Sequence, residues 1–162
     1  MNRYRSTICL ALTSLAVVLF VGRATAGEQV PFNGTLAGDV THTPVDAQTN
    51  AVLVEATGTA TQMGQFAMVS AHHLNTVART AAGTFVFTAA NGDKVFADFT
   101  GQGQPATPGV VAVVETATIT GGTGRFAGAS GSFVVQRIYD RAAGTTTGSF
   151  QGAITSPGAA KE

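Results

Sequence analysis

Short segments that alternate apolar with polar residues, most of them bounded by Gly, Asn or Pro, recur along most of this chain. They are rich in Val, Phe, Thr and Ile, which favour the half-buried face of a β-strand. Because strand side chains point alternately to opposite faces, the pattern predicts sheets with one apolar face. We assign eight strands on this basis, to residues 29–38, 52–61, 65–74, 83–89, 94–102, 110–120, 132–140 and 146–155.

The connections between these segments limit how the strands can pair. Most are short, so strands that are neighbours in sequence pair antiparallel. Two are longer, residues 39–51 and residues 103–109. Eight antiparallel strands form either a sandwich or a closed barrel, and closure removes exposed strand edges. We therefore predict an all-β fold, an eight-stranded antiparallel up-and-down β-barrel, wide enough for packed side chains or one small ligand.

Composition excludes several other classes of protein. The chain has 162 residues, which suits one domain, and 44% of them are apolar, too many for a disordered chain. Nine basic residues balance nine acidic ones, so no basic surface points to nucleic acid as a partner. Twenty Gly and five Pro argue against a helical bundle.

The first 26 residues have the pattern of a secretory signal peptide. Arg3 and Arg5 precede an apolar run over residues 7–22, which ends at Ala24-Thr25-Ala26. The run is shorter than the roughly 20 residues that a membrane span needs. We expect residues 1–26 to be removed, residues 27–162 to form a single barrel domain, and the mature chain, without a membrane span, to be secreted or periplasmic.

Cleavage after Ala26 also changes the chemistry of the chain. It removes Cys9, the only cysteine, so the mature domain has no disulfide, thiolate nucleophile or Cys-based zinc site. It removes three of the nine basic residues as well, and six basic side chains then face nine acidic ones. This excess of negative charge argues further against DNA or anionic lipid as a partner.

One hairpin can be assigned from the faces of its strands. A two-residue loop at Asn91-Gly92 would place Phe85 opposite Asp98, because residues opposite each other in an antiparallel pair share a face. A three-residue loop over residues 90–92 puts Gly92 at the left-handed position of a type I turn with a bulge. We prefer the longer loop because it collects the apolar side chains on one face: Phe85, Phe87, Val95, Ala97 and Phe99.

The most distinctive segment is Gly-rich and reads ITGGTGRFAGASGSF over residues 119–133. We interpret it as a corner between two strands with Phe126 turned inward. A dinucleotide-binding loop would need a strand before it and a helix after it, and here strands lie on both sides. We therefore expect Gly122 and Gly124 to serve the fold rather than to bind a ligand.

This segment resembles a motif of the dirigent proteins and the allene oxide cyclase-like barrels. Supporting stretches are ATGTATQMGQF at 56–66, ANGDKVF at 90–96 and GTTTGSFQGAI at 144–154, so the resemblance spans residues 52–154. It implies a calycin-type, eight-stranded antiparallel barrel with an apolar interior cavity. Members include cyclases, dirigent proteins that direct stereochemistry, and small secreted bacterial proteins, so the resemblance says more about fold than about function.

Glu115 and Arg137 are the strongest candidates for a site. Alternation places Glu115 on the apolar face of segment 110–120, and Arg137 and Tyr139 on the apolar face of segment 132–140. If Thr120 pairs with Ser132, Glu115 lies directly opposite Arg137. We expect an ion pair, which either fixes the strand register or serves as a polar anchor in a ligand pocket.

Other polar residues give weaker signals. His72 and His73 are adjacent in a strand, so they face opposite sides and cannot hold one metal together. His42 falls in a predicted connection, and Glu55 fits either face of its strand. We assign no catalytic residue, metal or cofactor, because no His, Asp, Glu or Ser spacing predicts one.

Three functions remain compatible with the sequence. The first is a non-catalytic binder of a small apolar ligand, or simply a stable extracellular module. The alternative is a cyclase-like or dirigent-like enzyme that guides a reactive intermediate inside the barrel, and the third is an interaction or structural protein of the cell envelope. The partners to consider are a small apolar ligand and a second copy of the chain. The candidate cavity residues are Glu115, Arg137, Tyr139, Phe85, Phe87 and Phe99.

The interior of the barrel should discriminate between these functions. A cavity of roughly 300 Å³ or more with Glu115 in its wall would favour a ligand. An interior filled by aromatic rings would favour a structural role. The rings in question are Phe85, Phe87, Phe99, Phe126 and Phe133.

Overall fold

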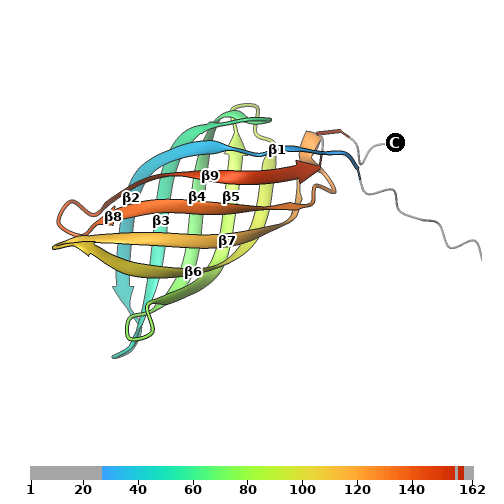
Figure 1. Cartoon of the computed structure of the whole chain (residues 1–162). Coiled ribbons are helices and arrows are strands. Elements are labelled where there is room, and N and C mark those ends of the chain that lie inside the picture. The colour runs from blue at the N-terminus through green and yellow to red at the C-terminus, as the bar shows by residue number, and fades with distance from the viewer. Residues whose placement is uncertain (1–26, 156, 159–162) are drawn as a thin grey trace, which may run out of the picture.

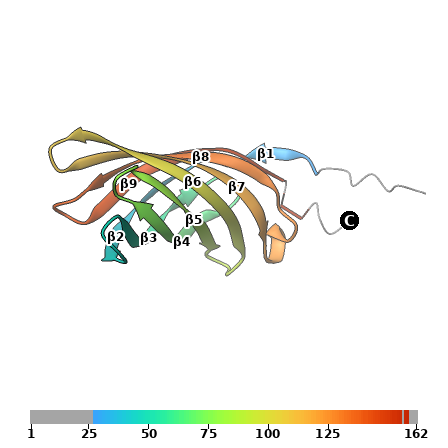
Figure 2. The same ribbon diagram turned by 90° about the horizontal axis from the view of Figure 1, so that it is seen from below.

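A computed structural model describes residues 27–155 and 157–158, and the predicted signal peptide lies outside them. The described chain forms one antiparallel sheet that curls into a barrel (Figures 1 and 2). Its strands are β1 (Gln29–Pro31), β2 (Gly34–Pro44), β3 (Thr49–Ala60), β4 (Gly64–Asn75), β5 (Thr80–Ala89), β6 (Lys94–Thr107), β7 (Val110–Gly122), β8 (Gly131–Asp140) and β9 (Thr145–Thr155). One short 3-10 helix, η1 (Gly124–Phe126), follows β7.

The strand order confirms the predicted up-and-down barrel. Each strand from β2 to β9 pairs with its neighbours in sequence, and β9 also pairs with β2, which closes the ring. The predicted strand 29–38 is divided into β1 and β2, which pair with different parts of β9. Phe32 lies at the division and turns its ring into the interior, where it is completely buried.

The two long connections predicted from the sequence are wrong. β2 runs to Pro44 and β3 begins at Thr49, while β6 runs to Thr107 and β7 begins at Val110. Pro105 lies within β6, where a strand tolerates proline because a bulge interrupts the ladder, and a register shift follows this residue. As a result His42 belongs to β2 instead of a loop.

The β5–β6 hairpin has the predicted three-residue register. Phe87 is opposite Val95 and Phe85 is opposite Ala97. Gly92 has φ 88°, and its amide donates to the Ala89 carbonyl over 2.9 Å. The five apolar side chains assigned to this face are all buried.

One half of the barrel is filled by aromatic rings. We call this set the aromatic core: Phe32, Phe66, Phe85, Phe87, Phe133 and Phe150. Neighbouring rings in it lie 5.1–6.1 Å apart between centroids, mostly edge-on or tilted, as aromatic pairs prefer. η1 lies at this end of the barrel, where it packs against β6 and β7 (Figures 1 and 2), and Phe126 is buried as expected. No helix long and apolar enough to cross a membrane occurs in the described part of the chain.

Substituting Val at Gly122 or Gly124 should lower stability by about 1–3 kcal/mol. A Cβ at Gly122 would overlap the backbone carbonyl oxygen of Lys94, while Gly124 has φ 57° and a Cβ there would overlap the Asp93 carboxylate. Urea denaturation measures the loss. Gly64→Val is the matched control for Gly124, because Gly64 has φ 70° and no atom of the described residues lies within 4 Å of the position a Cβ would take. Unchanged stability in the Gly122 and Gly124 variants would contradict this role.

Candidate functional site

The other half of the barrel contains a cavity of about 910 Å³. Residues of the β4–β5, β6–β7 and β8–β9 turns line it, so it lies at the end of the barrel opposite η1. Apolar side chains of four strands contribute to its wall: Val40, Val52, Leu74, Val111 and Val113. Three buried polar residues also line it: His72, Glu115 and Arg137. We call them the floor of the cavity, because they lie where it meets the aromatic core.

Glycines opposite the floor residues provide the space for buried polar side chains. Gly83 lies opposite His72 in the β4–β5 ladder, Gly101 opposite Glu115 in β6–β7, and Gly148 opposite Arg137 in β8–β9. A Cβ at Gly101 would lie 2.6 Å from Glu115 Cγ, and a Cβ at either of the other two would overlap its neighbour as well. The sequence therefore places long polar side chains inside the barrel by leaving the facing positions empty.

Glu115 and Arg137 form a buried bidentate ion pair. Arg137 Nε donates to Glu115 Oε2 over 2.9 Å, and Arg137 Nη2 donates to Oε1 over 2.6 Å. Glu115 is 0% exposed and Arg137 is 8% exposed. Arg137 Nη1 also donates to Thr146 Oγ1 over 3.3 Å, and that hydroxyl donates to the Ile138 carbonyl. Each charged group thus has its hydrogen-bond partners, as a buried pair requires.

The predicted register of these two strands is wrong by two residues. Val113, and not Glu115, lies opposite Arg137, and Thr118, and not Thr120, lies opposite Ser132. The Gly-rich corner is longer than assumed, because η1 occupies part of it. A shift of two preserves which face each side chain occupies, so the pair forms diagonally, within the reach of long side chains.

His72 contributes a neutral imidazole to the floor. It is largely buried, its Nδ1 lies 3.2 Å from Ser70 Oγ, and its ring meets Phe99 edge-on at 5.3 Å. Burial lowers the pKa of His72 to about 4, with smaller contributions from the positive charge of Arg137 and from His42 and His73. The ring is therefore uncharged at neutral pH.

His42 reaches the cavity from β2, although the sequence pattern had placed it in a connection between strands. Its ring lies 5.2 Å from that of Tyr139, and neither ring nitrogen has a hydrogen-bond partner among the described residues. Burial, followed by the charges of Arg141 and Arg137, lowers the pKa of His42. Its two-residue spacing from the inward-facing Val40 was the signal that could have identified it.

The sequence-predicted site residues divide between the two halves of the barrel. Glu115, Arg137 and Tyr139 line the cavity. Phe85, Phe87 and Phe99 are buried but are not among the lining residues, and Phe85 stacks on Phe99 at 4.3 Å. The barrel therefore has both features that were expected to discriminate between functions, a cavity and an aromatic filling, at opposite ends.

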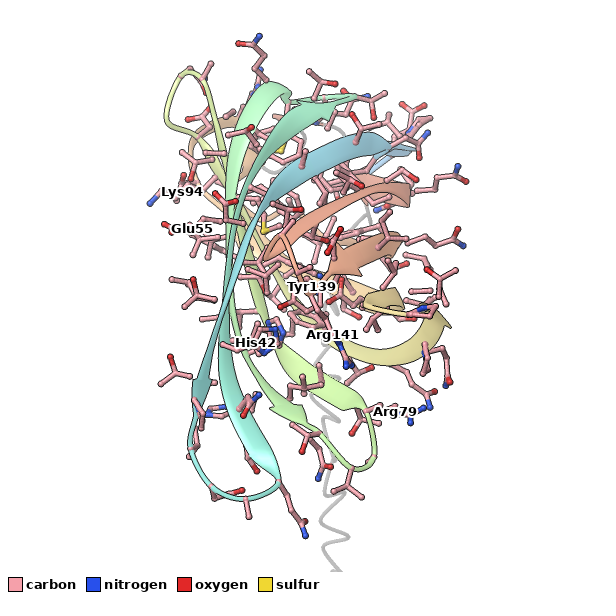
Figure 3. The ribbon with its side chains drawn as sticks, turned by 90° about the vertical axis from the view of Figure 1, so that its left-hand side faces the viewer. His42, Glu55, Arg79, Lys94, Tyr139 and Arg141 are labelled. Atoms are coloured by element: carbon pink, nitrogen blue, oxygen red, sulfur yellow. The ribbon has the colours of Figure 1, made fainter. Side chains whose placement is uncertain are left out.

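Residues outside the cavity are placed as follows. Glu55 is exposed on the outer face of β3, pointing away from the barrel (Figure 3). His73 is also exposed, on the face opposite His72, as predicted. Within residues 27–155 and 157–158, no three His, Cys, Asp or Glu side chains are grouped so that they could hold a metal ion.

Comparison with known proteins supports the fold. No family model matches the sequence, and no curated protein matches it. Among solved structures, the pterocarpan synthase dirigent protein GePTS1 is similar over 91% of this chain and 99% of that one, with a TM-score of 0.58 and 12% identity. The chain thus has the dirigent-like barrel fold that its Gly-rich segment predicted, here with an aromatic core in one half and a polar-floored cavity in the other.

Proposed function

We propose that this protein is a binding protein that holds a small, mainly apolar molecule in the cavity of its barrel. The observation that carries the proposal is the cavity itself, about 910 Å³ with apolar walls above a hydrogen-bonded polar floor. Small-molecule sites commonly have volumes of about 300–1,000 Å³, apolar linings and a few fixed polar groups. This site has all three properties.

Packing supports a binding role over a purely structural one. Protein interiors are close-packed, and unfilled space in a core costs stability. Half of this barrel is filled by aromatic rings, while the other half has Gly or Ala at inward positions such as Ala81 and Gly103. A barrel selected only for stability would fill these positions. An apolar ligand would restore the missing contacts and remove apolar wall from water.

A second candidate is a guiding role, in which the cavity orients a reactive intermediate while it cyclises or couples. The similarity to a pterocarpan synthase dirigent protein favours it. A guiding protein changes the stereoisomer ratio of products that also form without it, whereas a binder leaves that ratio unchanged. Chiral chromatography of phenol-coupling products, made with and without the protein, separates the two roles.

The folded protein should bind the uncharged fluorescent probe N-phenyl-1-naphthylamine, with a blue shift and increased emission. Val113→Trp should weaken binding at least about tenfold, equivalent to 1.4 kcal/mol, because Val113 lines the cavity and Trp would fill it. Val114→Trp is the matched control, since Val114 is exposed on the outer face of β7. Absence of probe binding by the folded wild-type protein would contradict the binding function.

We also propose that the protein is exported and that its mature form begins at Gly27. The Ala24-Thr25-Ala26 pattern after an apolar run supports this. N-terminal sequencing of protein recovered from outside the cytoplasm should give Gly27 first. Recovery of exported protein that retains Met1 would contradict cleavage.

A further inference from the structure

The charges that line the cavity do not balance. Three arginines contribute to its lining, Arg79, Arg137 and Arg141, and Glu115 is the only carboxylate among the described lining residues. Glu115 is occupied on both oxygens by Arg137. Neither Arg79 nor Arg141 takes part in an ion pair within the described part of the chain. The mouth of the cavity therefore carries positive charge that no lining side chain of the described residues neutralises.

The imidazole of His42 also lines the cavity. Both ring nitrogens of His42 are shielded from solvent and have no hydrogen-bond partner in the described part of the chain, which is unfavourable for a buried polar group. Figure 3 shows His42, Tyr139 and Arg141 in the same part of the barrel, with Arg79 farther away, at the turn between β4 and β5. The ring contact between His42 and Tyr139 and the charge effect of Arg141 on His42 agree with this placement.

We propose that the ligand carries one acid group, which binds between His42 and Arg141 while its apolar body lies against the valine and leucine walls. This inference rests on the proposed binding function and specifies its ligand as an aliphatic or aromatic acid. An anionic oxygen would accept hydrogen bonds from the imidazole and the guanidinium, and such charge-assisted bonds are the strong ones. Arg79 would add attraction at longer range.

Arg137 is a poorer site for the acid group than Arg141. Its Nε and Nη2 are bonded to Glu115 and its Nη1 to Thr146, so most of its donors are in use. The Glu115 carboxylate would also repel a second anion placed beside it. The ligand's polar end is thus expected toward the mouth of the cavity and its apolar end toward the floor.

Binding of an acid group should be linked to uptake of a proton. The groups that face His42 are Arg137 and Tyr139 of β8, Arg141 of the next turn, and His72 of β4, with Glu115 of β7 bonded to Arg137. Burial and the two arginines lower the pKa of His42, and a bound anion would raise it again. Affinity for an acidic probe should therefore rise as the pH falls through the range in which His42 takes up its proton.

Two probes with the same aromatic body test the proposal. N-phenyl-1-naphthylamine is uncharged, and 1-anilinonaphthalene-8-sulfonate differs from it by one sulfonate. Arg141→Gln should weaken binding of the sulfonate about tenfold, a loss of 1.4 kcal/mol, and change binding of the uncharged probe less than about twofold. His42→Gln should abolish the pH dependence of sulfonate binding. Lys94→Gln is the control, because it removes one positive charge from the outer surface (Figure 3).

The outcomes distinguish the two proposals. If neither probe binds the folded protein, the binding function fails and this inference fails with it. If the uncharged probe binds but the sulfonate does not, the acid-group inference is overturned while the binding function stands. The acid-group inference is also overturned if Arg141→Gln weakens the binding of both probes equally. It is overturned as well if Lys94→Gln weakens sulfonate binding as much as Arg141→Gln does. Retained binding of the uncharged probe shows that each variant is folded.

Discussion

Glu115→Gln is expected to destabilise the protein by about 3–5 kcal/mol. The substitution removes the negative charge that faces Arg137, whose guanidinium is almost fully buried and donates two hydrogen bonds to the Glu115 carboxylate. Arg137→Met should cost a similar amount, because it leaves the Glu115 carboxylate buried without its partner. Urea denaturation of the purified variants measures both losses.

The double variant separates the interaction from the cost of burying each charge. Replacing both groups removes the desolvation of two ions together with their attraction, so the loss should be well below the sum of the single losses. Glu55→Gln is the matched control, because Glu55 is exposed on the outer face and its substitution should change stability by less than about 0.5 kcal/mol. Small, additive losses at Glu115 and Arg137 would mean that both groups are solvated.

The same variants show whether the ion pair serves only the fold. Glu115 and Arg137 both line the cavity. If the double variant is stable and no longer binds N-phenyl-1-naphthylamine, the pair anchors the ligand or shapes the floor beneath it. If the double variant binds the probe with unchanged affinity, the pair fixes the barrel and the walls alone provide the binding energy.

The fold could be predicted because a strand's side chains alternate between two faces. That rule assigned the strands, placed Glu115 and Arg137 inside, and selected the register of the β5–β6 hairpin, where only one loop length brings Phe85 opposite Ala97. The short connections then determined the up-and-down order of the strands. Each of these inferences uses contacts between neighbours in sequence.

The register of β7 against β8 could not be predicted by the same rule. Slipping a strand by two residues leaves every side chain on its original face, so the alternation rule does not discriminate between Val113 and Glu115 as the residue opposite Arg137. The loop between the strands would have discriminated between them. Its length depends on η1, a turn of helix for which the Gly-rich sequence gave no signal.

An interior cavity was expected from the resemblance, but its size and its position in the barrel could not be predicted from the sequence, for a different reason. Its volume comes from small residues on separate strands, such as Gly83 on β5, Gly101 on β6 and Gly148 on β9. Read along the chain, each glycine looks like the end of a strand or a turn. Only the closed barrel shows that these glycines face long polar side chains and that Arg141 and His42 lie on the same side of one mouth.

Phe87→Ala is expected to destabilise the protein by about 3–5 kcal/mol, the usual cost of truncating a fully buried aromatic side chain. Phe87 is 0% exposed and packs against five other rings: Phe32, Phe66, Phe85, Phe133 and Phe150. Phe96→Ala removes the same atoms from the opposite face of the sheet, where the ring is only half-buried, and should cost clearly less. Thermal and urea denaturation compare the two variants.

Binding of N-phenyl-1-naphthylamine to the Phe87→Ala variant tests whether the two halves of the barrel act separately. Phe87 is not among the residues that line the cavity, so the dissociation constant should change less than about twofold while the free energy of unfolding falls. Tighter binding, or binding of a second probe molecule, would show that the space left by the ring joins the cavity. The ligand site would then extend into the aromatic core, and Phe85, Phe87 and Phe99 would belong to it.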